Sequence, residues 1–363
     1  MKKLKAAYFG TPYFSANFLE KLILDISSPV EIMLVVTQPD KPVGKKHTIT
    51  SSPVKVTAQK YKIPVWDKPL IQMSSDQLIL SQCDVALVFA YGFKELIPLD
   101  FLKAPKLQFD IGEGKKSGFI NIHPSLLPRY RGSSPITFPL MLGDTETGVT
   151  LFVMDEKMDH GPVIAQEKIK IALNDVRMDL EKKLTELGFE MTKKLLTQLS
   201  NNQQITTGNQ NHAFATHAHY LQKKDGFVPL ESLKKALQDK SLRQDELPEV
   251  IQIYISKYSY KILDPKSPIY CMLNQQKDPE SSKTESGHSN NLIYNFWRAM
   301  HPWPGLWTHI SPRGSANDAG EELKRLKIIQ MMYSNGKATI TKVQLEGKKE
   351  VDFATFQKAY GLL

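Results

Sequence analysis

The densest group of chemically capable side chains lies between residues 121 and 161. Asn121 and His123 come at the end of an apolar stretch, Gly118–Ile122, and their two-residue spacing points both side chains to the same side of an extended chain. Asp159 follows a second apolar stretch, Gly148–Met154, in a short turn. An amide can stabilise an oxyanion, an imidazole can move a proton, and a carboxylate can orient the imidazole. This combination of residues suits acyl transfer.

The sequence offers no obvious nucleophile of its own for such a reaction. It contains no G-x-S-x-G serine signature and no comparable cysteine signature, so we expect the attacking group to come from the substrate. A structural interpretation is also open, because an Asn-x-His pair at a strand end can be a hydrogen-bonded pair and Asp is a common turn residue. Spacing alone does not decide between the two interpretations.

Elements that would position these residues alternate along the first two hundred residues, in the pattern of an α/β domain. Apolar runs predict strands at Leu4–Phe9, Val30–Thr37, Asp84–Ala90, Gly118–Ile122, Gly148–Met154 and, at an edge, Ile164–Ile171. Helical spacing predicts helices at Phe14–Leu24, Val54–Tyr61, Ile136–Leu142 and Val176–Ser200. Strands separated by helices predict a Rossmann-like, mostly parallel sheet with its site at the carboxyl ends of the strands.

The composition changes after the polar segment Asn201–Asn211. Alternating, aromatic-rich segments then predict a small, mostly β domain such as an OB-like barrel, with strands at Ile251–Tyr260, Leu292–Met300, Leu326–Met332 and Ala338–Leu345. Gln275–Asn291 has almost no apolar residue, and we expect a mobile surface loop there. The resulting division is a catalytic domain over residues 1–204, a linker over 205–215 and a C-terminal domain over 216–363.

The charge, the cysteines, the histidines and the apolar stretches limit which classes of function are possible. Lys and Arg number 47 against 38 Asp and Glu, and this excess favours contact with a polyanion such as nucleic acid. The two cysteines exclude a disulfide framework, and His212, His217 and His219 fit no common metal-ligand spacing, so we expect no metal. No stretch approaches the roughly 20 apolar residues of a membrane helix. We therefore expect a cytoplasmic protein without membrane contact, and nothing demands more than a monomer.

Several motifs together resemble one enzyme family. The pattern Asn-x-His, then Ser-Leu-Leu-Pro, then a distant Asp before Gly resembles the formyltransferases that use 10-formyltetrahydrofolate. Within that superfamily the chain is similar to the branch that acts on methionyl-tRNA. The matching segments are FGTPYF (Phe9–Phe14), TQPDKP (Thr37–Pro42), SPVK (Ser52–Lys55), AYG (Ala90–Gly92), SLLPRYRGSSPI (Ser125–Ile136), GDTETGVT (Gly143–Thr150), KKDG (Lys223–Gly226), RAMHPWPGLWT (Arg298–Thr308) and VQLEGKK (Val343–Lys349). These segments follow the family's order over nearly the whole chain, apart from Gln275–Asn291, so the resemblance is more specific than any single motif.

The resemblance implies roles for individual residues. Asn121, His123 and Asp159 would be catalytic. The folate cosubstrate would contact Ser125, Leu126, Leu127, Pro128, Tyr91 and Gly92. The initiator methionyl-tRNA would contact the basic residues Lys41, Lys45, Lys46, Arg129, Arg131, Lys223 and Lys224.

The lysines of residues 41–66 support a nucleic-acid partner, because this stretch holds six lysines and no acidic residue. Its first part, KPVGKKH, follows a predicted strand, and we expect a loop near the site. In the resembling family the corresponding loop is typically longer, contains arginine and contacts the acceptor end of the tRNA. Lysine supplies a point charge without the bidentate fork of arginine, so the contacts here would differ in detail. The alternative interpretation is a solvated lysine-rich surface.

The expected activity is therefore formyl transfer from 10-formyltetrahydrofolate to the amino group of methionyl-tRNA. Two alternatives stay open. One is a formyltransferase for another amine, such as glycinamide ribonucleotide or a nucleotide-linked amino sugar, which would share the Asn121, His123 and Asp159 set. The other is a nucleic-acid-binding OB protein with an inactive α/β domain, against which the intact set argues.

Overall fold

The computed structural model describes residues 3–44, 47–72, 77–90, 92, 97–258, 263–277, 288–311 and 323–361. The chain divides into two compact units. The first contains Met1–Pro135, Thr147–Ile169 and Glu181–His217, and the second contains Ile136–Glu146, Lys170–Leu180 and Ala218–Leu363. The predicted linker at residues 205–215 stays a prediction.

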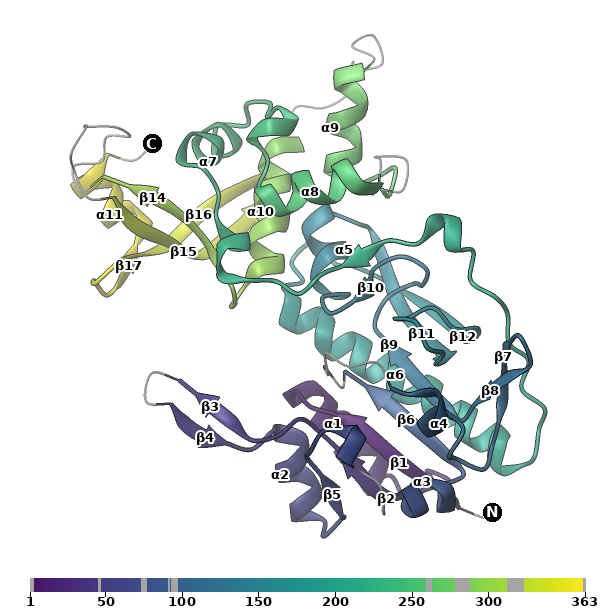
Figure 1. Ribbon diagram of the computed structural model, residues 1–363. Coiled ribbons are helices and arrows are strands. Elements are labelled where there is room, and N and C mark those ends of the chain that lie inside the picture. Colours follow the sequence, from purple (N-terminus) through teal and green to yellow (C-terminus); the bar gives the residue numbers. More distant parts are fainter. Residues whose placement is uncertain are drawn as a thin grey trace. The chain divides into compact units, whose positions relative to one another are not determined.

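A seven-stranded sheet in the order β12-β11-β9-β6-β1-β2-β5 forms the centre of the first unit (Figure 1). Its strands are β1 (Leu4–Gly10), β2 (Val30–Val36), β5 (Val65–Trp66), β6 (Val85–Phe89), β9 (Phe119–His123), β11 (Glu146–Val153) and β12 (Val163–Lys170). The pairs β1–β2, β1–β6, β6–β9 and β2–β5 are parallel, whereas β11 runs antiparallel to β9. The mostly parallel sheet predicted from the sequence is confirmed, with β12 at its edge. Strand β5 was not predicted, because two residues are too few to show a period.

Helices and two hairpins accompany this sheet in the first unit. The helices are α1 (Tyr13–Leu24), α2 (Pro53–Lys60), α3 (Gln77–Gln82), α4 (Leu99–Leu102) and α6 (Arg177–Ser200). The hairpins pair β3 (Lys41–Val43) with β4 (Thr48–Thr50), and β7 (Phe109–Gly112) with β8 (Lys115–Ser117). The remaining short elements are η1 (Leu70–Gln72), β10 (Arg131–Gly132), η2 (His212–Phe214) and β13 (His217–Ala218). Helix α2 begins where its sequence signals a start, because the Ser52 side chain accepts from Lys55 N (3.0 Å) and Pro53 occupies the first turn.

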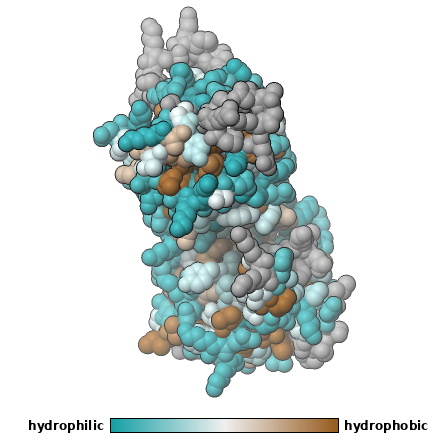
Figure 2. Space-filling view, turned by 90° about the vertical axis from the view of Figure 1, so that its left-hand side faces the viewer, coloured by the Kyte–Doolittle hydropathy of each residue, from teal (hydrophilic) through white to brown (hydrophobic). Residues whose placement is uncertain are grey.

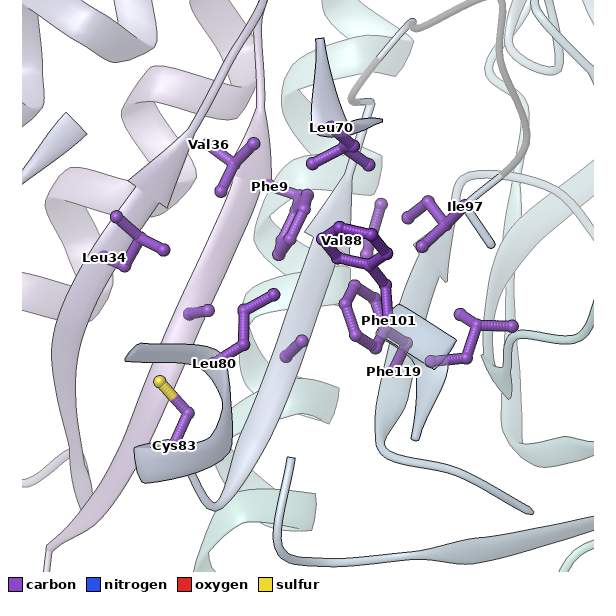
Figure 3. Packing of buried hydrophobic residues seen from close by; sticks show 13 residues of the cluster. Phe9, Leu34, Val36, Leu70, Leu80, Cys83, Val88, Ile97, Phe101 and Phe119 are labelled. Carbon is purple, nitrogen blue, oxygen red and sulfur yellow. The ribbon is translucent and has the colours of Figure 1, made fainter. Parts of the chain in front are cut away.

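Apolar residues cover both faces of the central strands, as expected for parallel strands buried between helices. On one face, Phe9, Val36, Val88 and Phe119 pack with residues of α3 and α4 (Figure 3). The opposite face is aromatic: Phe18 of α1 lies 4.8 Å from Phe89 and 6.1 Å from Phe189 of α6, measured between ring centroids. Since neighbouring residues alternate between the two faces, this packing fixes which side chains each strand presents at its carboxyl end.

Cys83 lies in the apolar cluster that contains Phe9 and Phe119, and its thiol donates to Ile79 O (3.3 Å). Burial, followed by the negative charge of Asp84, raises the pKa of this thiol to about 11, against an ordinary value of 9.0. This higher pKa lowers the thiolate fraction at pH 8 by about 100-fold, and the thiolate is the reactive form. We therefore expect a disulfide reagent at pH 8 to label Cys271 in the folded protein and Cys83 only after unfolding.

A Cys271→Ser variant is the control for this labelling. It should react with no equivalent of reagent when folded and with one equivalent in denaturant. Rapid labelling of the folded Cys271→Ser protein would show that Cys83 is accessible and would contradict the assigned burial.

The second unit combines helices with a four-stranded antiparallel sheet in the order β14-β15-β16-β17. The strands are β14 (Leu306–Ile310), β15 (Lys324–Ser334), β16 (Lys337–Leu345) and β17 (Glu350–Asp352). The helices and 3₁₀ turns are α5 (Thr137–Leu142), η3 (Lys223–Gly226), α7 (Leu230–Leu237), η4 (Gln244–Glu246), α8 (Glu249–Tyr258), α9 (Pro268–Lys277), α10 (His288–Met300) and α11 (Phe353–Tyr360). The separate C-terminal sheet confirms the predicted small β component, and β15 and β16 confirm two of its four predicted strands.

The other two predicted strands were wrong. Ile251–Tyr260 lies largely in α8 and Leu292–Met300 lies in α10. Their β-branched and aromatic residues suggested strands, but their buried positions recur at helical spacing, as in Ile251, Tyr254 and Ile255. The expected loop at residues 275–291 is also helical at both ends, within α9 and α10, and residues 278–287 lie outside the described residues.

The visible surface is mostly polar. Figure 2 shows hydrophilic residues over most of one face, with apolar residues in small separate groups. Large exposed apolar side chains such as Ile26, Ile49 and Tyr220 occur far apart in the sequence, and single exposed apolar residues are ordinary. None of the helices in the described part of the chain combines the length and the apolar character needed to cross a membrane.

Candidate active site

Strand β9 presents Asn121 and His123 at its carboxyl end. Asn121 pairs with Val88 of the parallel strand β6 and with Phe152 of the antiparallel strand β11, while His123 pairs with Thr150. The two side chains therefore lie beside the carboxyl end of β6, with that of β1 one strand further along, and this is the edge at which parallel sheets usually carry their sites.

Asp159 reaches the same place from the turn after β11. Its Oδ1 lies 3.5 Å from Asn121 Nδ2, and its Oδ2 lies 3.7 Å from His123 Nδ1. Oδ2 also accepts a short hydrogen bond from Gly132 N (2.6 Å). The turn that carries Asp159 is tight: Asp159 has φ +47°, and a Cβ at Gly161 would lie 1.9 Å from Val153 O. The structure thus brings Asn121, His123 and Asp159 together, and their catalytic roles stay a prediction.

The imidazole of His123 is held from both sides. It is only 4% exposed, and its Nε2 donates to Tyr130 O (3.0 Å) while Nδ1 faces Asp159 Oδ2. Tyr130 adopts φ +63°, a left-handed conformation that is uncommon for a bulky residue. One carbonyl oxygen and one carboxylate oxygen therefore fix the orientation of this ring.

The loop after β9 is held by a hydrogen bond within the loop and by the side chains of Thr150 in β11 and Gln166 in β12. Ser125 Oγ donates to Arg129 O (2.8 Å), and Thr150 Oγ1 donates to Ser125 O (2.7 Å) and accepts from Leu127 N (3.1 Å). Gln166 Nε2 donates to Leu127 O (3.0 Å). Of the residues predicted to line a folate site, Ser125 and Leu127 are buried, whereas Leu126 and Pro128 are partly exposed.

Gly92, another residue of the predicted folate site, comes shortly after β6. It is exposed, adopts φ +67°, and its carbonyl accepts a hydrogen bond from Gln38 Nε2. Its neighbour Tyr91 lies outside the described residues. Because β6 pairs in parallel with β9, the loop holding Gly92 starts at the same sheet edge as Asn121.

Comparison with known proteins decides the family. Residues 3–196 match the family model described as formyl transferase. The chain belongs to the formyl transferase family. A methionyl-tRNA formyltransferase of Synechococcus elongatus is 39% identical over 225 residues, which cover 61% of this chain and 64% of that protein. A methionyl-tRNA formyltransferase of Staphylococcus epidermidis is 38% identical over 221 residues, which cover 61% of this chain and 66% of that protein. The matches thus span just under two thirds of these relatives.

A solved structure agrees with this fold. A 4-N formyltransferase from Francisella tularensis superposes with a TM-score of 0.50 at 16% identity, covering 84% of this chain and 92% of that one. The resemblance inferred from sequence motifs is therefore confirmed at the level of family and fold.

The lysines predicted to contact tRNA are spread over both units of the chain. Lys41 is exposed on β3, so the expected loop is in part a β-hairpin, and Lys45 and Lys46 lie outside the described residues. Lys55 of the same basic stretch instead forms ion pairs with Asp40 (2.9 Å) and Asp67 (2.7 Å). Lys223 and Lys224 are exposed in η3 of the second unit. They line a surface hollow of about 300 Å³ together with Trp307, His309, Arg325 and Glu346.

The two predicted arginines differ in their surroundings. Arg129 is partly exposed, and its guanidinium lies 4.7 Å from the ring centroid of Tyr130. Arg131 is only 5% exposed, and its Nη2 donates to Gln210 Oε1 (2.6 Å) and to His212 Nδ1 (2.8 Å). Burial lowers the pKa of the Arg131 guanidinium from its ordinary value. The guanidinium of Arg131 therefore contacts protein side chains beside the candidate site.

Sequence reasoning missed the residues that hold the site from behind. Thr150, Gln166 and Gln210 each make hydrogen bonds that fix the loops around Asn121 and His123. Gln210 lay inside the segment expected to be a linker, and a polar residue in a polar segment carries no signal of burial. In the described part of the chain, no three histidine, cysteine or acidic side chains gather as a metal site.

Proposed function

We propose that this chain transfers a formyl group from 10-formyltetrahydrofolate to the amino group of methionyl-tRNA, giving N-formylmethionyl-tRNA for translation initiation. The observation that carries the proposal is the convergence of Asn121, His123 and Asp159 at the carboxyl end of β9. The proposal is supported by this chain's membership of the formyl transferase family and by its similarity to methionyl-tRNA formyltransferases.

The attacking group in this proposal is the substrate's amine. A free α-amino group titrates near pH ~8, so a usable neutral fraction exists at cellular pH. The amine attacks the formyl carbon, a tetrahedral oxyanion forms, and the bond from that carbon to N10 of the folate then breaks. In net terms one proton leaves the amine and one arrives on N10.

Residues of this chain would stabilise the oxyanion and orient the imidazole during these steps. The amide of Asn121 donates to the oxyanion, and Asp159 holds the ring of His123 through the facing Nδ1 and Oδ2 atoms, 3.7 Å apart. The folate would lie along the loop at Ser125–Pro128, where Leu126 and Pro128 offer partly exposed apolar surface, and beside Tyr91 and Gly92. Because this loop is already hydrogen-bonded to Thr150 and Gln166, little ordering is needed when the ligand binds.

The tRNA would contact basic residues of both units, namely Lys41, Lys45, Lys46, Arg129, Lys223 and Lys224. Arg131 would contribute its positive charge from a buried position. Residues 1–204 would supply the catalytic part and residues 216–363 the tRNA-binding part. We also propose that the chain works as a monomer in the cytoplasm.

Neutralising Lys41, Lys45 and Lys46 together is expected to weaken tRNA use. A phosphate that is no longer neutralised by lysine keeps its condensed counterions, so the slope of log affinity against log salt should become shallower by roughly 2–3. The measurement is the apparent affinity for methionyl-tRNA between low and moderate salt. A control triple variant at Lys103, Lys106 and Lys116, which are exposed on the α4–β8 segment, removes the same charge and should keep the wild-type slope. An unchanged slope in the first variant would refute the role of this lysine cluster.

The test of the proposed activity is a formylation assay with one folate donor and several acceptors. Methionyl-tRNA should be formylated, while glycinamide ribonucleotide and a nucleotide-linked amino sugar should not. Formylation of a small amine alone would favour the alternative acceptor class, and no transfer to any acceptor would favour a nucleic-acid-binding protein.

A further inference from the structure

The turn that carries Asp159 is held from behind by the side chain of Gln210. Its Nε2 donates to Asp159 O (3.1 Å) and to Gly161 O (2.8 Å), so one amide group bridges both ends of the turn. Gln210 is only 7% exposed. Its segment is fixed beside the turn by two backbone hydrogen bonds between Gly208 and Val163, each of 2.8 Å.

Arg131 connects this bridge to the other support of Asp159. Its Nη2 donates to Gln210 Oε1 (2.6 Å), which leaves the Gln210 amide nitrogen directed at the two carbonyl oxygens. The next residue, Gly132, donates its backbone N–H to Asp159 Oδ2 (2.6 Å). The same short strand, β10, therefore holds the carboxylate of Asp159 directly and its main chain through Gln210.

His212 limits the conditions under which this arrangement can form. Its Nδ1 lies 2.8 Å from Arg131 Nη2, and a guanidinium only donates, so Nδ1 must be unprotonated. The ring stacks on His160, with centroids 4.0 Å apart and an interplanar angle of 3°, and His160 Nδ1 lies 2.6 Å from Asp155 Oδ2.

The charges around His212 favour its neutral form. Burial lowers its pKa from the ordinary 6.5, and His160, Arg131 and Lys157 act in the same direction, whereas Asp155 opposes them. As pH falls below about 6.5, the unfolded chain binds a proton that the folded ring does not, so the native arrangement loses stability through this group. The loss continues until the pH has passed below the lowered value in the folded protein.

We propose that Gln210 and Arg131 are positioning residues that hold Asp159 against His123, and that they do so only while His212 is neutral. The part that concerns turnover rests on the proposed function, whereas the part that concerns His212 does not. None of the three residues needs to touch the substrate. Their loss would displace Asp159, and a misplacement of about 1 Å at a reaction site can lower the rate by about 10²-fold.

A pair of Gln210 variants tests the positioning role. Gln210→Glu keeps an oxygen for Arg131 and loses the two N–H donors, while Gln210→Ala loses both functions. We expect kcat to fall by about 10- to 100-fold in both, with KM for the folate changed less than about twofold. The matched control is Gln204→Ala, which changes an exposed glutamine of the same segment and should keep wild-type kinetics. A lower melting temperature with an unchanged kcat in Gln210→Glu would show a purely structural role and overturn the proposal.

The pH dependence gives a second readout. His212→Asn keeps an acceptor for Arg131 that does not titrate in this range. We expect its kcat to decline less than that of the wild type between pH 7 and pH 5.5. An identical decline in both proteins would show that protonation of His212 does not control the arrangement.

A measurement without substrate separates this inference from the proposed function. In protein with ¹⁵N-labelled histidine, NMR at pH 7 should show His212 with an unprotonated Nδ1 in the wild type. In Arg131→Met this ring should lose its fixed tautomer and its pKa should rise, because a positive neighbour and a donor are gone. If the wild-type ring already exchanges between tautomers, the proposed hydrogen bond does not form, whatever acceptor the enzyme formylates.

Discussion

Asn121→Ala should lower the single-turnover rate of formyl transfer by ~10²–10³-fold, the usual loss when one oxyanion donor is removed. The side chain is partly exposed at the end of β9, and its amide makes a long hydrogen bond to Asp159 (3.5 Å). Because so weak a bond adds little stability, we expect the variant to fold normally. Stopped-flow or quench-flow transfer with a saturating folate donor measures the rate, and the thermal unfolding midpoint checks the fold.

Asn17→Ala is the matched control for this variant, because Asn17 is an exposed asparagine of α1 in the same unit. It should keep both the wild-type rate and the wild-type melting temperature. A rate for Asn121→Ala within a few-fold of the wild type would remove Asn121 from the proposed mechanism.

His123→Ala should lower the same rate by ~10²–10⁴-fold, the range expected for a group that handles protons in the transition state. The substitution also removes a buried ring and its hydrogen bond to the carbonyl of Tyr130, which costs about 1–3 kcal/mol of stability. Both effects must be separated before the rate is interpreted.

His123→Gln separates them. A glutamine amide can donate to Tyr130 O and restore part of the lost stability, yet it does not titrate and cannot carry a proton as an imidazole does. We expect His123→Gln to melt closer to the wild type than His123→Ala while transferring formyl no faster than about 1% of the wild-type rate. Wild-type rates in both variants would contradict a role for this histidine.

Sequence periodicity predicted the elements correctly where a strand is buried on both faces or a helix is buried on one face only. The strands that form the centre of the parallel sheet are near-continuous apolar runs, as in Val85–Phe89, and α1 repeats its buried residues at helical spacing. These elements could be predicted because each one's pattern follows directly from what covers it. The spacing of Asn121 and His123 likewise needed only the two-residue period of a strand.

Periodicity failed where short segments carry residues that suit both structures. In α8 and α10, tyrosine, tryptophan and isoleucine have high β-propensity, but tertiary packing on one helical face decided the outcome. The strand β5 was too short to be recognised.

The supports of the site could not be predicted for a different reason. Arg131 was predicted only as a tRNA contact, because nothing in the sequence reveals that Gln210, about eighty residues later, accepts its guanidinium hydrogen bond. The link between Gln210 and the turn at Asp159 also depends on how two loops meet in space. Such contacts between distant loops leave no local pattern.

The most direct test of the proposed activity is one turnover with a folate donor that carries a labelled formyl group and with methionyl-tRNA in excess. We predict that the wild-type protein moves about one equivalent of label per active site onto the α-amino group of methionine, and that the Asn121→Ala protein moves almost none in the same time. Label that stays on the folate in the wild-type reaction, or that reaches the tRNA equally fast in both proteins, would contradict this mechanism.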